Sequence, residues 1–298
     1  MTRLVVLGAK GFIGRALCAR AKSEALAVLA FGSADHDLLD ASTWEGLSAA
    51  LHPSDTVVML AALTPRRGRD PATLGKNVCM ARTVCRALEE AGCQHVVYVS
   101  SDAVYGYSDA PVSESSPTAW NSLYATMHLV RESMFAKSCG DRLLVVRPTQ
   151  IYGTGEPHDS YGPNRMLKQA LARGEIEIFG YGEEFRDHIS IDDFVDVIMA
   201  LLARRTTGIL NVVSGYSVRF AEIATMIQRL AAPGCVVRNE RRAVPITHRH
   251  FDVTQLRRAV AGFAPLPLES GVKRLFENET VTTTTRKMGS PVAPRDKS

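Results

Sequence analysis

A glycine-rich loop directly after the first apolar run restricts the fold of this chain more than any other feature. The sequence GAKGFIG at residues 8–14 follows the apolar residues 4–7 and leads into a helical stretch over about 12–22. Between a strand and a helix, such glycines permit a tight turn, let the backbone approach a pyrophosphate and allow close helix–strand contact. The N–H groups at the helix start then favour bound phosphate. The loop therefore predicts a dinucleotide-binding site with contacts at Gly8, Lys10, Gly11, Phe12, Ile13 and Gly14.

Apolar segments of strand length alternate with helical segments through the first half of the chain. The runs at 27–31, 56–60, 95–99 and 143–146 are apolar apart from Thr56 and His95. Residues 72–92 show the three- and four-residue spacing of one buried helix face. Continuous apolar strands separated by helices are typical of a parallel sheet covered on both faces. We therefore predict an α/β fold, a doubly wound parallel (Rossmann) sheet with a smaller α/β substrate-binding lobe on its C-terminal side.

The alternation becomes less regular after residue 152, which divides the chain into expected units. A loop rich in Gly, Pro and Tyr precedes further helices and strands, and the C-terminal end carries four threonines followed by Arg, Lys, Gly, Ser and Pro. We predict a dinucleotide-binding domain at 1–152 with its sheet completed by about 187–214, a substrate-binding lobe at 153–186 and 215–277, and a disordered tail at 278–298.

Composition and charge argue against several classes of protein. The chain of 298 residues is 46% hydrophobic, and no apolar run reaches the roughly 18 residues of a membrane helix. A net charge of +4 does not by itself argue for nucleic acid, which needs a clustered basic face. Six cysteines form no CxxC pair, which favours reduced thiols. We therefore expect a cytoplasmic protein without nucleic-acid or membrane partners.

The end of the second predicted strand bears on which dinucleotide is bound. A carboxylate at that position would bind the ribose 2′-OH of NAD, but the strand ends at Phe31 and the first acidic residue after it is Asp35. Lys10, with Arg15 as a further candidate, could meet the 2′-phosphate of NADP. We expect NAD(P) with a lean towards NADP, the alternative being that Lys10 is a solvated surface charge.

Further motifs follow the glycine loop in an ordered series. They are DLLD at 37–40, LAA at 60–62, SSDAVYG at 100–106, YATMH at 124–128, RPTQIYG at 147–153 and GYGEEFRDHISIDD at 180–193. From residue 4 to about 276 the chain resembles the extended branch of the short-chain dehydrogenase/reductase family. That branch includes nucleotide-sugar epimerases of the UDP-galactose 4-epimerase type, dehydratases and ketoreductases. The resemblance implies further cofactor contacts at Ser33, Asp37, Leu38, Leu60, Ala61, Ala62, Asn77, Tyr124, His128, Pro148 and Ile151.

The resemblance also implies the groups that carry out the chemistry. Hydride exchange between a sugar carbon and nicotinamide needs a group that takes or gives the hydroxyl proton. Tyr124 matches the family's acid/base, and Ser101 matches the hydroxyl that hydrogen-bonds the substrate oxygen. The alternative for Tyr124 is a side chain that only packs. The cation of the family's Tyr-x-x-x-Lys pattern makes the tyrosinate accessible near neutral pH.

His128 departs from that pattern because it stands where the family has lysine. Residues four apart share a helix face, so His128 can point where the lysine would. A histidine with an unperturbed pKa is only about a quarter protonated at pH 7. Three interpretations remain open: a working substitute, a slower or altered reaction, or a loss of redox catalysis that leaves a non-catalytic NAD(P)-binding module.

Asp102 occupies a position at which the family's 4,6-dehydratases also carry an acid. In those enzymes the next residue is a glutamate that acts as base, whereas this chain has Ala103. The missing proton-transfer partner disfavours elimination of water. Asp102 is therefore either catalytic or a residue that caps its loop.

The resemblance assigns the substrate to the C-terminal lobe. Arg186 matches the arginine that grips the nucleotide diphosphate, which suits a guanidinium fork, the alternative being an ion pair with Asp187. Gln150 and Asn164 are further substrate candidates. Arg242 is a candidate for a second diphosphate arginine, with Arg241 and Arg249 as close rivals. The histidines at 248 and 250 lack a neighbouring Cys or carboxylate cluster, and we expect no metal.

These observations lead to a function expressed as a hypothesis. We expect an NAD(P)-dependent nucleotide-sugar epimerase that oxidises and re-reduces a sugar hydroxyl, at C4, with Tyr124 as acid/base. An NADPH-dependent 4-ketoreductase or a dehydratase is the alternative, and a non-catalytic module is the second alternative. The resemblance also implies a homodimer formed through the helices at 72–92 and 123–137.

Overall fold

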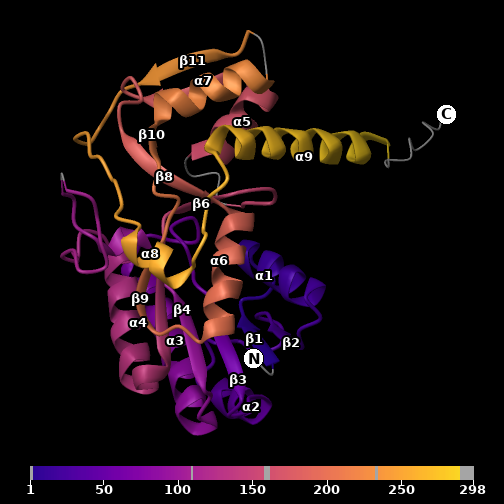
Figure 1. Ribbon diagram of the computed structural model, residues 1–298, viewed down its shortest axis with the longest axis vertical. Helices are drawn as coiled ribbons and strands as arrows, with labels where there is room; N and C mark the ends of the chain where they lie inside the picture. Colours follow the sequence, from indigo (N-terminus) through magenta and orange to yellow (C-terminus); the bar gives the residue numbers. More distant parts are fainter. Residues whose placement is uncertain (1–2, 109, 158–161, 232–233, 289–298) are drawn as a thin grey trace, which may run out of the picture.

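A six-stranded sheet forms the centre of the larger part of the molecule (Figure 1). Its strand order is β2-β1-β3-β4-β5-β9, and each neighbouring pair is parallel. The strands are β1 (Arg3–Leu7), β2 (Val28–Phe31), β3 (Asp55–Met59), β4 (His95–Val99), β5 (Leu143–Pro148) and β9 (Gly208–Val212). This computed structural model describes residues 3–108, 110–157, 162–231 and 234–288, and it confirms the predicted Rossmann sheet.

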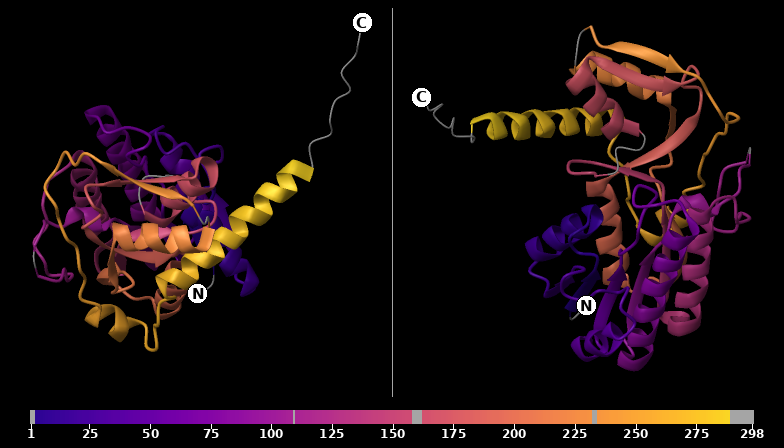
Figure 2. Two further views of the ribbon diagram at one scale, coloured as in Figure 1. Left: turned by 90° about the horizontal axis from the view of Figure 1, so that it is seen from above. Right: turned by 180° about the vertical axis from the view of Figure 1, so that it is seen from behind.

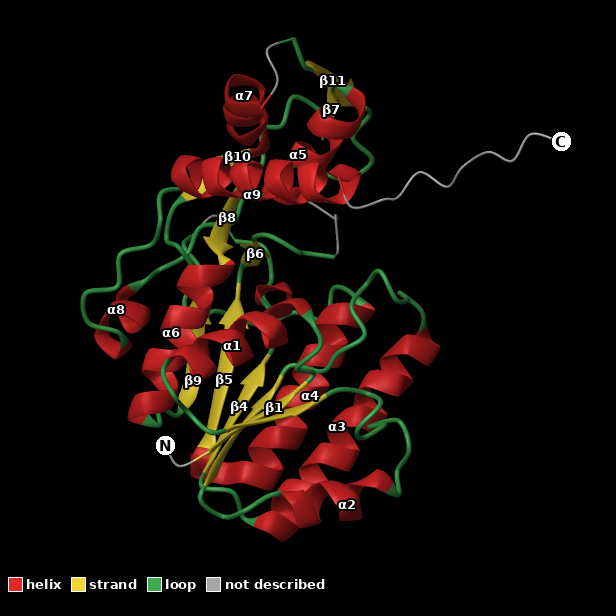
Figure 3. Cartoon of the chain, turned by 90° about the vertical axis from the view of Figure 1, so that its right-hand side faces the viewer, coloured by secondary structure: helices red, strands yellow, loops and turns green. Residues whose placement is uncertain are grey.

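The central strands are buried on both faces because their alternate residues enter two different cores. In β1, Leu4 and Val6 belong to the first core, while Val5 and Leu7 belong to the second. The first core is covered by α1 (Phe12–Ser23), α6 (Ile191–Arg204) and α8 (Thr254–Ala259); the second by α2 (Thr43–Ala50), α3 (Pro71–Ala91) and α4 (Leu123–Cys139) (Figure 3). Burial on two sides explains why these strands are continuously apolar in sequence.

The two helices nearest the predicted catalytic residues begin at capping side chains. Asp70 accepts the N–H of Thr73 at 2.7 Å at the start of α3, and Gly92, with φ of 62°, ends that helix. Ser122 Oγ accepts the N–H of Ala125 at 3.1 Å at the start of α4. Capping at position 122 places residue 124 in the first helical turn.

A smaller lobe lies beyond the C-terminal ends of the sheet strands (Figures 1 and 3). It contains a three-stranded sheet in the order β10-β8-β6 and a parallel pair of β11 and β7. Its strands are β6 (Gln150–Tyr152), β7 (Glu175–Phe179), β8 (Phe185–Ser190), β10 (Ser217–Arg219) and β11 (Val236–Glu240). The helices α5 (Gly162–Arg173), α7 (Phe220–Ala231) and α9 (Leu268–Met288) complete it around a third core.

Two short 3₁₀ helices connect elements of the larger part. The first, η1 (Asp102–Val104), follows β4, and the second, η2 (Gly140–Arg142), joins α4 to β5. No helix within the described ranges is both long enough and apolar enough to span a lipid bilayer.

The structure differs from the predicted unit boundaries in three places. Residues 251–263 return to the Rossmann part, where Phe251 and Leu256 are buried in the first core. Strand β8 begins at Phe185 and pairs within the lobe, so that β9 alone of the elements in 187–214 joins the main sheet. Helix α9 continues through residue 288, where a disordered tail was expected, and extends outwards from the lobe (Figure 2). Residues 289–298 lie outside the described part of the chain.

Candidate functional site

The glycine loop has the close backbone contacts that the sequence predicts. Gly8 has φ of 94°, and a Cβ there would lie 2.8 Å from the amide nitrogen of Ala61. A Cβ at Gly14 would lie 2.3 Å from the carbonyl oxygen of Gly8. Gly11 precedes α1 and makes no side-chain cap, which leaves the N–H groups of the first turn available to a phosphate. The loop therefore forms a narrow backbone cradle between β1 and α1.

Phe12 and Ile13 begin α1 directly after the loop, and their partly buried side chains pack against the first core. Leu60, Ala61 and Ala62 follow β3 beside the loop, and the N–H of Leu60 bonds to the carbonyl oxygen of Leu7 at 2.9 Å. The predicted cofactor contacts on β1 and β3 are thus neighbours at the C-terminal edge of the sheet.

Lys10 contacts the end of β2 and has an acidic neighbour there. Its aliphatic chain lies over Gly32, where a Cβ would be 2.7 Å from Lys10 Cδ. Its Nζ is 3.7 Å from Asp35, whose carboxylate also accepts the N–H of Gly32 at 2.7 Å. That backbone hydrogen bond, with Lys10, lowers the pKa of Asp35. We did not identify Asp35 as a site residue from the sequence, although it follows the strand end by only four positions.

The predicted adenine-side residues divide between surface and core. Ser33 and Asp37 are exposed, and Asp37 Oδ1 accepts the N–H of Leu39 at 3.0 Å. Leu38 is buried in the second core. Asn77 is buried as well, and its amide bonds to both backbone groups of Leu63, at 2.8 and 3.0 Å. Asn77 therefore ties the loop after β3 to α3.

Ser101 and Tyr124 meet at the C-terminal edge of β4. Ser101 Oγ accepts the N–H of Ala103 at 3.1 Å, capping η1, and lies near enough to the Tyr124 hydroxyl to affect its pKa. Burial raises the pKa of the Tyr124 hydroxyl to about 12. Ser101 acts to lower this pKa, Asp102 to raise it further and the charge of Arg131 to lower it. The predicted pair is therefore together, with Tyr124 protonated at neutral pH.

His128 lies one helical turn after Tyr124 and faces the sheet. It is 2% exposed, its ring packs edge-on against that of Tyr124 with centroids 4.7 Å apart, and its Nδ1 is 2.7 Å from the hydroxyl of Tyr98 on β4. Burial and the nearby charge of Arg131 lower the pKa of His128 well below its usual value. The imidazole is therefore neutral rather than the partly charged group that an unperturbed pKa predicts.

The tautomer of His128 follows from its partner. Burial raises the pKa of Tyr98, so its hydroxyl keeps its proton and donates it to Nδ1. The ring proton then resides on Nε2, which is buried and has no hydrogen-bond partner within the described residues. His128 thus presents an unused N–H donor beside Tyr124.

Two charged residues on α4 were not identified from the sequence. Arg131 is fully buried and donates to the carbonyl oxygen of Ala61 at 2.8 Å. Glu132 accepts Ser100 Oγ at 2.5 Å and two bonds from Arg147, at 3.0 and 2.6 Å, which ties α4 to β4 and β5. A charged residue three positions after His128, on the same helix face, is the signal that could have identified Arg131.

Asp102 is held by a residue from the other end of the chain. Its carboxylate lies 3.6 Å from Arg249, which also donates to the backbone carbonyls of Asp102 and Tyr105. Burial raises the pKa of Asp102, opposed by Arg249 and then Arg186. Ser101 rather than Asp102 is the N-cap of η1. Arg249 is 6% exposed, so it is committed to this loop and does not form a free diphosphate contact.

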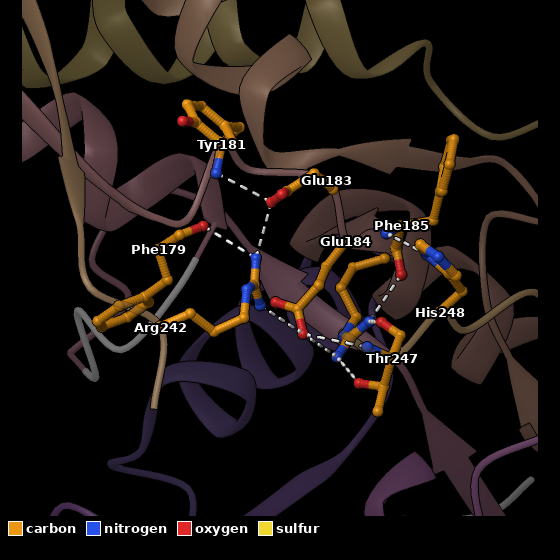
Figure 4. Close-up of polar contacts among 9 residues, drawn as sticks. Phe179, Tyr181, Glu183, Glu184, Phe185, Arg242, Thr247 and His248 are labelled. Atoms are coloured by element: carbon orange, nitrogen blue, oxygen red, sulfur yellow. Dashed lines mark hydrogen bonds and ion pairs between the residues drawn. The ribbon is translucent and has the colours of Figure 1, made fainter. Parts of the chain in front are cut away.

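The two predicted diphosphate arginines share an acidic partner. Glu184 lies 3.6 Å from Arg186 and 3.1 Å from Arg242. Arg242 also pairs with Glu183 at 2.9 Å, and Arg186 donates to Thr247 Oγ1 at 2.8 Å (Figure 4). The alternative partner considered for Arg186 was Asp187, but its carboxylate accepts from Ser214 and Gly215 instead. Both guanidinium groups are thus engaged within the protein.

The remaining predicted substrate residues differ in their free polar atoms. Asn164 bonds to both backbone groups of Gly153, at 3.0 and 2.8 Å, so its amide is occupied. Gln150 has a buried Oε1 without a partner among the described residues. Pro148 ends β5, and Ile151 in β6 packs against the first core. Of this group, Gln150 offers an unused acceptor.

The chain matches a family model and several known proteins. Residues 4–212 match the model of the NAD dependent epimerase/dehydratase family. A dTDP-4-dehydro-6-deoxy-D-allose reductase from Streptomyces bikiniensis is 26% identical, over 93% of this chain and 97% of that one. A UDP-glucose 4-epimerase from Mycolicibacterium smegmatis is also 26% identical, over 92% and 97%. The solved structure of TunA, an NAD-dependent NDP-hexosamine 5,6-dehydratase, shares the fold with a TM-score of 0.82 at 24% identity, covering 93% of this chain and 97% of TunA.

Proposed function

Because this chain belongs to the NAD-dependent epimerase/dehydratase family, we propose that it moves a hydride between NAD(P) and a hydroxyl-bearing carbon of a nucleotide-activated sugar, epimerising the sugar at C4. The observation that carries the proposal is that Ser101 and Tyr124 lie together at the edge of the sheet, beside the glycine cradle. Relatives that align over almost their whole length are named as a nucleotide-sugar epimerase and a reductase, which supports the substrate class.

The residues at the sheet edge fit a bound dinucleotide. The backbone cradle at Gly8 and Gly14 has no room for a Cβ, and the first turn of α1 offers N–H groups to a pyrophosphate. The unused Nε2–H of His128 suits a ribose hydroxyl. When bound, the nicotinamide supplies the acceptor and donor of the hydride.

Side chains of the protein transfer the proton and orient the reacting groups. Tyr124 exchanges a proton with the reacting sugar oxygen, and Ser101 donates a hydrogen bond to the same oxygen. His128 orients the cofactor ribose as a neutral donor, a working substitute for the family's lysine. In this assignment the hydrogen-bonding role of the lysine needs no charge at position 128.

A 4-ketoreductase is the second candidate function, favoured by one observation. Burial raises the pKa of Tyr124 to about 12, so at neutral pH its hydroxyl holds a proton that it can give to a ketone oxygen. Dehydration is less supported because Ala103 replaces the base and Asp102 is held by Arg249. Turnover without net change in NAD(P)H supports epimerisation, whereas stoichiometric NADPH loss supports reduction.

The test is a screen of UDP-, dTDP- and GDP-sugars, with absorbance followed at 340 nm and products separated by chromatography. Tyr124→Phe is the matched variant: it should bind NAD(P)H like the wild type and lose about 10²–10⁴-fold in turnover. If no sugar nucleotide is converted by folded, cofactor-bound wild-type protein, the proposed function is wrong.

We further propose that NADP is the preferred form, with Lys10 binding the 2′-phosphate. Lys10→Ala should then weaken NADPH binding without changing the Kd for NADH. Asp35→Asn should strengthen NADPH binding, because it removes the carboxylate 3.7 Å from Lys10 Nζ. Tighter NADH than NADPH binding by the wild type would contradict this preference.

Arg186 and Arg242 are our proposed diphosphate contacts, in competition with Glu184. Glu184→Gln should lower the KM for the nucleotide sugar by removing the competing charge. An unchanged KM would argue against both arginines. We also propose a homodimer through α3 and α4, which sedimentation of the full chain tests.

A further inference from the structure

Arg131 carries a buried positive charge without an acidic partner. Its side chain has no exposed area, and none of the described carboxylates forms an ion pair with it. Its guanidinium donates to the carbonyl oxygen of Ala61 at 2.8 Å and lies 3.4 Å from Asn77 Oδ1 and 3.7 Å from Met127 Sδ. Its Nε has no partner among the described residues. An isolated charge in the interior destabilises a fold, so a role that requires the charge is a reasonable inference.

Arg147 is a second buried arginine, and unlike that of Arg131 its guanidinium has an acidic partner among the described residues. Arg147 is 4% exposed and makes a two-bond ion pair with Glu132. Glu132 directly follows Arg131, yet its carboxylate faces Arg147 on β5. The charge on Arg131 is therefore left uncompensated although an acidic residue is its chain neighbour.

Arg131 lies on the same helix face as Tyr124, the residue proposed to transfer the proton. Tyr124, His128 and Arg131 follow one another at steps of four and three, so they line one face of α4. The guanidinium carbon of Arg131 lies 5.1 Å from the ring centre of Tyr98, whose hydroxyl bonds to His128. Through Ala61, the same guanidinium contacts the strand end that borders the glycine cradle.

We propose that Arg131 is a positioning residue that supplies the permanent positive charge for Tyr124, while neutral His128 supplies the hydrogen bond. The two roles of the single lysine that the family places at position 128 are thus divided between two residues of one helix face. This inference rests on the proposed function, because a charge near Tyr124 matters only if that hydroxyl transfers a proton.

The charged and titratable groups around the site support this division of the two roles between Arg131 and His128. Arg131 lowers the pKa of Tyr124 and also that of His128, which keeps the imidazole neutral. The other titratable groups around this face are Tyr98 on β4, Asp102 on η1, Cys85 on α3 and the Glu132–Arg147 pair. Of these, Asp102 raises the pKa of Tyr124, so Arg131 opposes the carboxylate across the site.

The test measures the ionisation of Tyr124 without any sugar. Protein labelled with ¹³Cζ-tyrosine is titrated by NMR from pH 8 to 12.5, with the Tyr124 resonance assigned by its loss in Tyr124→Phe. Arg131→Gln keeps a donor for the Ala61 carbonyl but has no charge. It should lower the tyrosinate fraction of Tyr124 about tenfold at a given pH, the size expected for one nearby charge in a protein.

Two further variants separate charge from structure. His128→Lys/Arg131→Gln returns a cation to the helix face and should restore the tyrosinate fraction to at least the wild-type level. Arg142→Gln removes hydrogen bonds to the carbonyl oxygens of Cys139 and Ser138, at 3.1 and 3.3 Å, at the far end of α4, and should leave the titration unchanged. If Arg131→Gln fails to fold, the folded double variant and Arg131→Lys are compared instead, and both should titrate like the wild type.

Two results would overturn the inference. The first is a Tyr124 titration that is the same in the wild type and in folded Arg131→Gln. The second is about tenfold less tyrosinate than the wild type in the double variant or in Arg131→Lys. The result is independent of the proposed function. A shifted titration with no sugar nucleotide converted would leave the effect of the Arg131 charge on Tyr124 and reject the function, whereas turnover with an unshifted titration would reject that effect and leave the function.

Discussion

The hydroxyl of Tyr98 lies 2.7 Å from Nδ1 of His128, and this contact sets the state of the residue that stands in place of the family's lysine. A strand residue in the second core thereby determines which ring nitrogen of a site residue carries the proton. Since the contact is buried at both ends, its loss cannot be compensated by water.

Tyr98→Phe is expected to remove this control while keeping the ring, which stacks on Phe135 at 4.8 Å. The unpaired Nδ1 should cost about 1–3 kcal/mol in urea unfolding. NAD(P)H binding should weaken several-fold because the His128 tautomer is no longer defined. Tyr105→Phe is the control, since it breaks an equally short buried bond, 2.7 Å to Asn211. It should match the stability loss, and an equal loss of cofactor affinity in the control would contradict the prediction.

His128→Lys is expected to retain or raise turnover. Lysine restores the residue of the family pattern, and its longer chain can reach the ribose that the Nε2–H of His128 is proposed to bind. Steady-state kcat with the converted sugar nucleotide measures the effect, and His128→Ala, which offers neither donor nor charge, should lose activity. A folded but inactive His128→Lys protein would count against the substitution of histidine for lysine.

Gly14→Ala is expected to lose cofactor binding. The added Cβ would lie 2.3 Å from the backbone oxygen of Gly8, so the cradle between β1 and α1 must open. NAD(P)H titration by fluorescence should show at least a tenfold weaker Kd and thermal unfolding a lower Tm. Gly75→Ala, in the middle of α3 with no neighbour within 4 Å, should instead stabilise the protein by roughly 0.5–1 kcal/mol. Unimpaired binding in Gly14→Ala would show that no close approach is needed there.

Acid is expected to destabilise the fold through His188. Burial lowers the pKa of His188 to about 4, so the folded state holds it neutral while the unfolded state takes up a proton below about 6.5. Its contribution is therefore present above pH 6.5 and is lost as pH falls towards 4, by about 3 kcal/mol at most. His188→Gln should flatten the pH dependence of the urea midpoint in that window.

Asp187 has the opposite effect on stability in acid, so its contribution must be measured together with that of His188. Burial raises its pKa to about 6, so its contribution is fully present below its unfolded pKa and is lost as pH rises through 6. Asp187→Asn should therefore steepen the acid loss that His188 causes. If the urea midpoints of wild type and His188→Gln run parallel from pH 7 to 4, the assignment to His188 is wrong.

Much of the nucleotide-binding half could be predicted because its determinants are local in sequence. The glycine loop must lie between a strand and a helix, the apolar runs must be buried on both faces, and Gly92 ends α3 with φ of 62°. The pairing of Ser101 with Tyr124 is implied by the family resemblance of the motifs at 100–106 and 124–128.

The partners of the charged site residues could not be predicted in this way. Glu184 pairs with Arg242 across 58 positions, and Arg249 reaches Asp102 across 147. Such pairs depend on how the segment at 241–250 crosses from the lobe to the Rossmann part, which no local pattern encodes.

The sequence by itself determined the parallel sheet, the glycine cradle and the departure from lysine at position 128. Only the tertiary structure decided the surroundings of that position. Burial against β4 makes His128 neutral, Tyr98 selects its tautomer, and Arg131 carries the charge on the same helix face. The reason is physical: protonation and pairing depend on desolvation and on neighbours in space, whereas sequence spacing reports only which residues share an element.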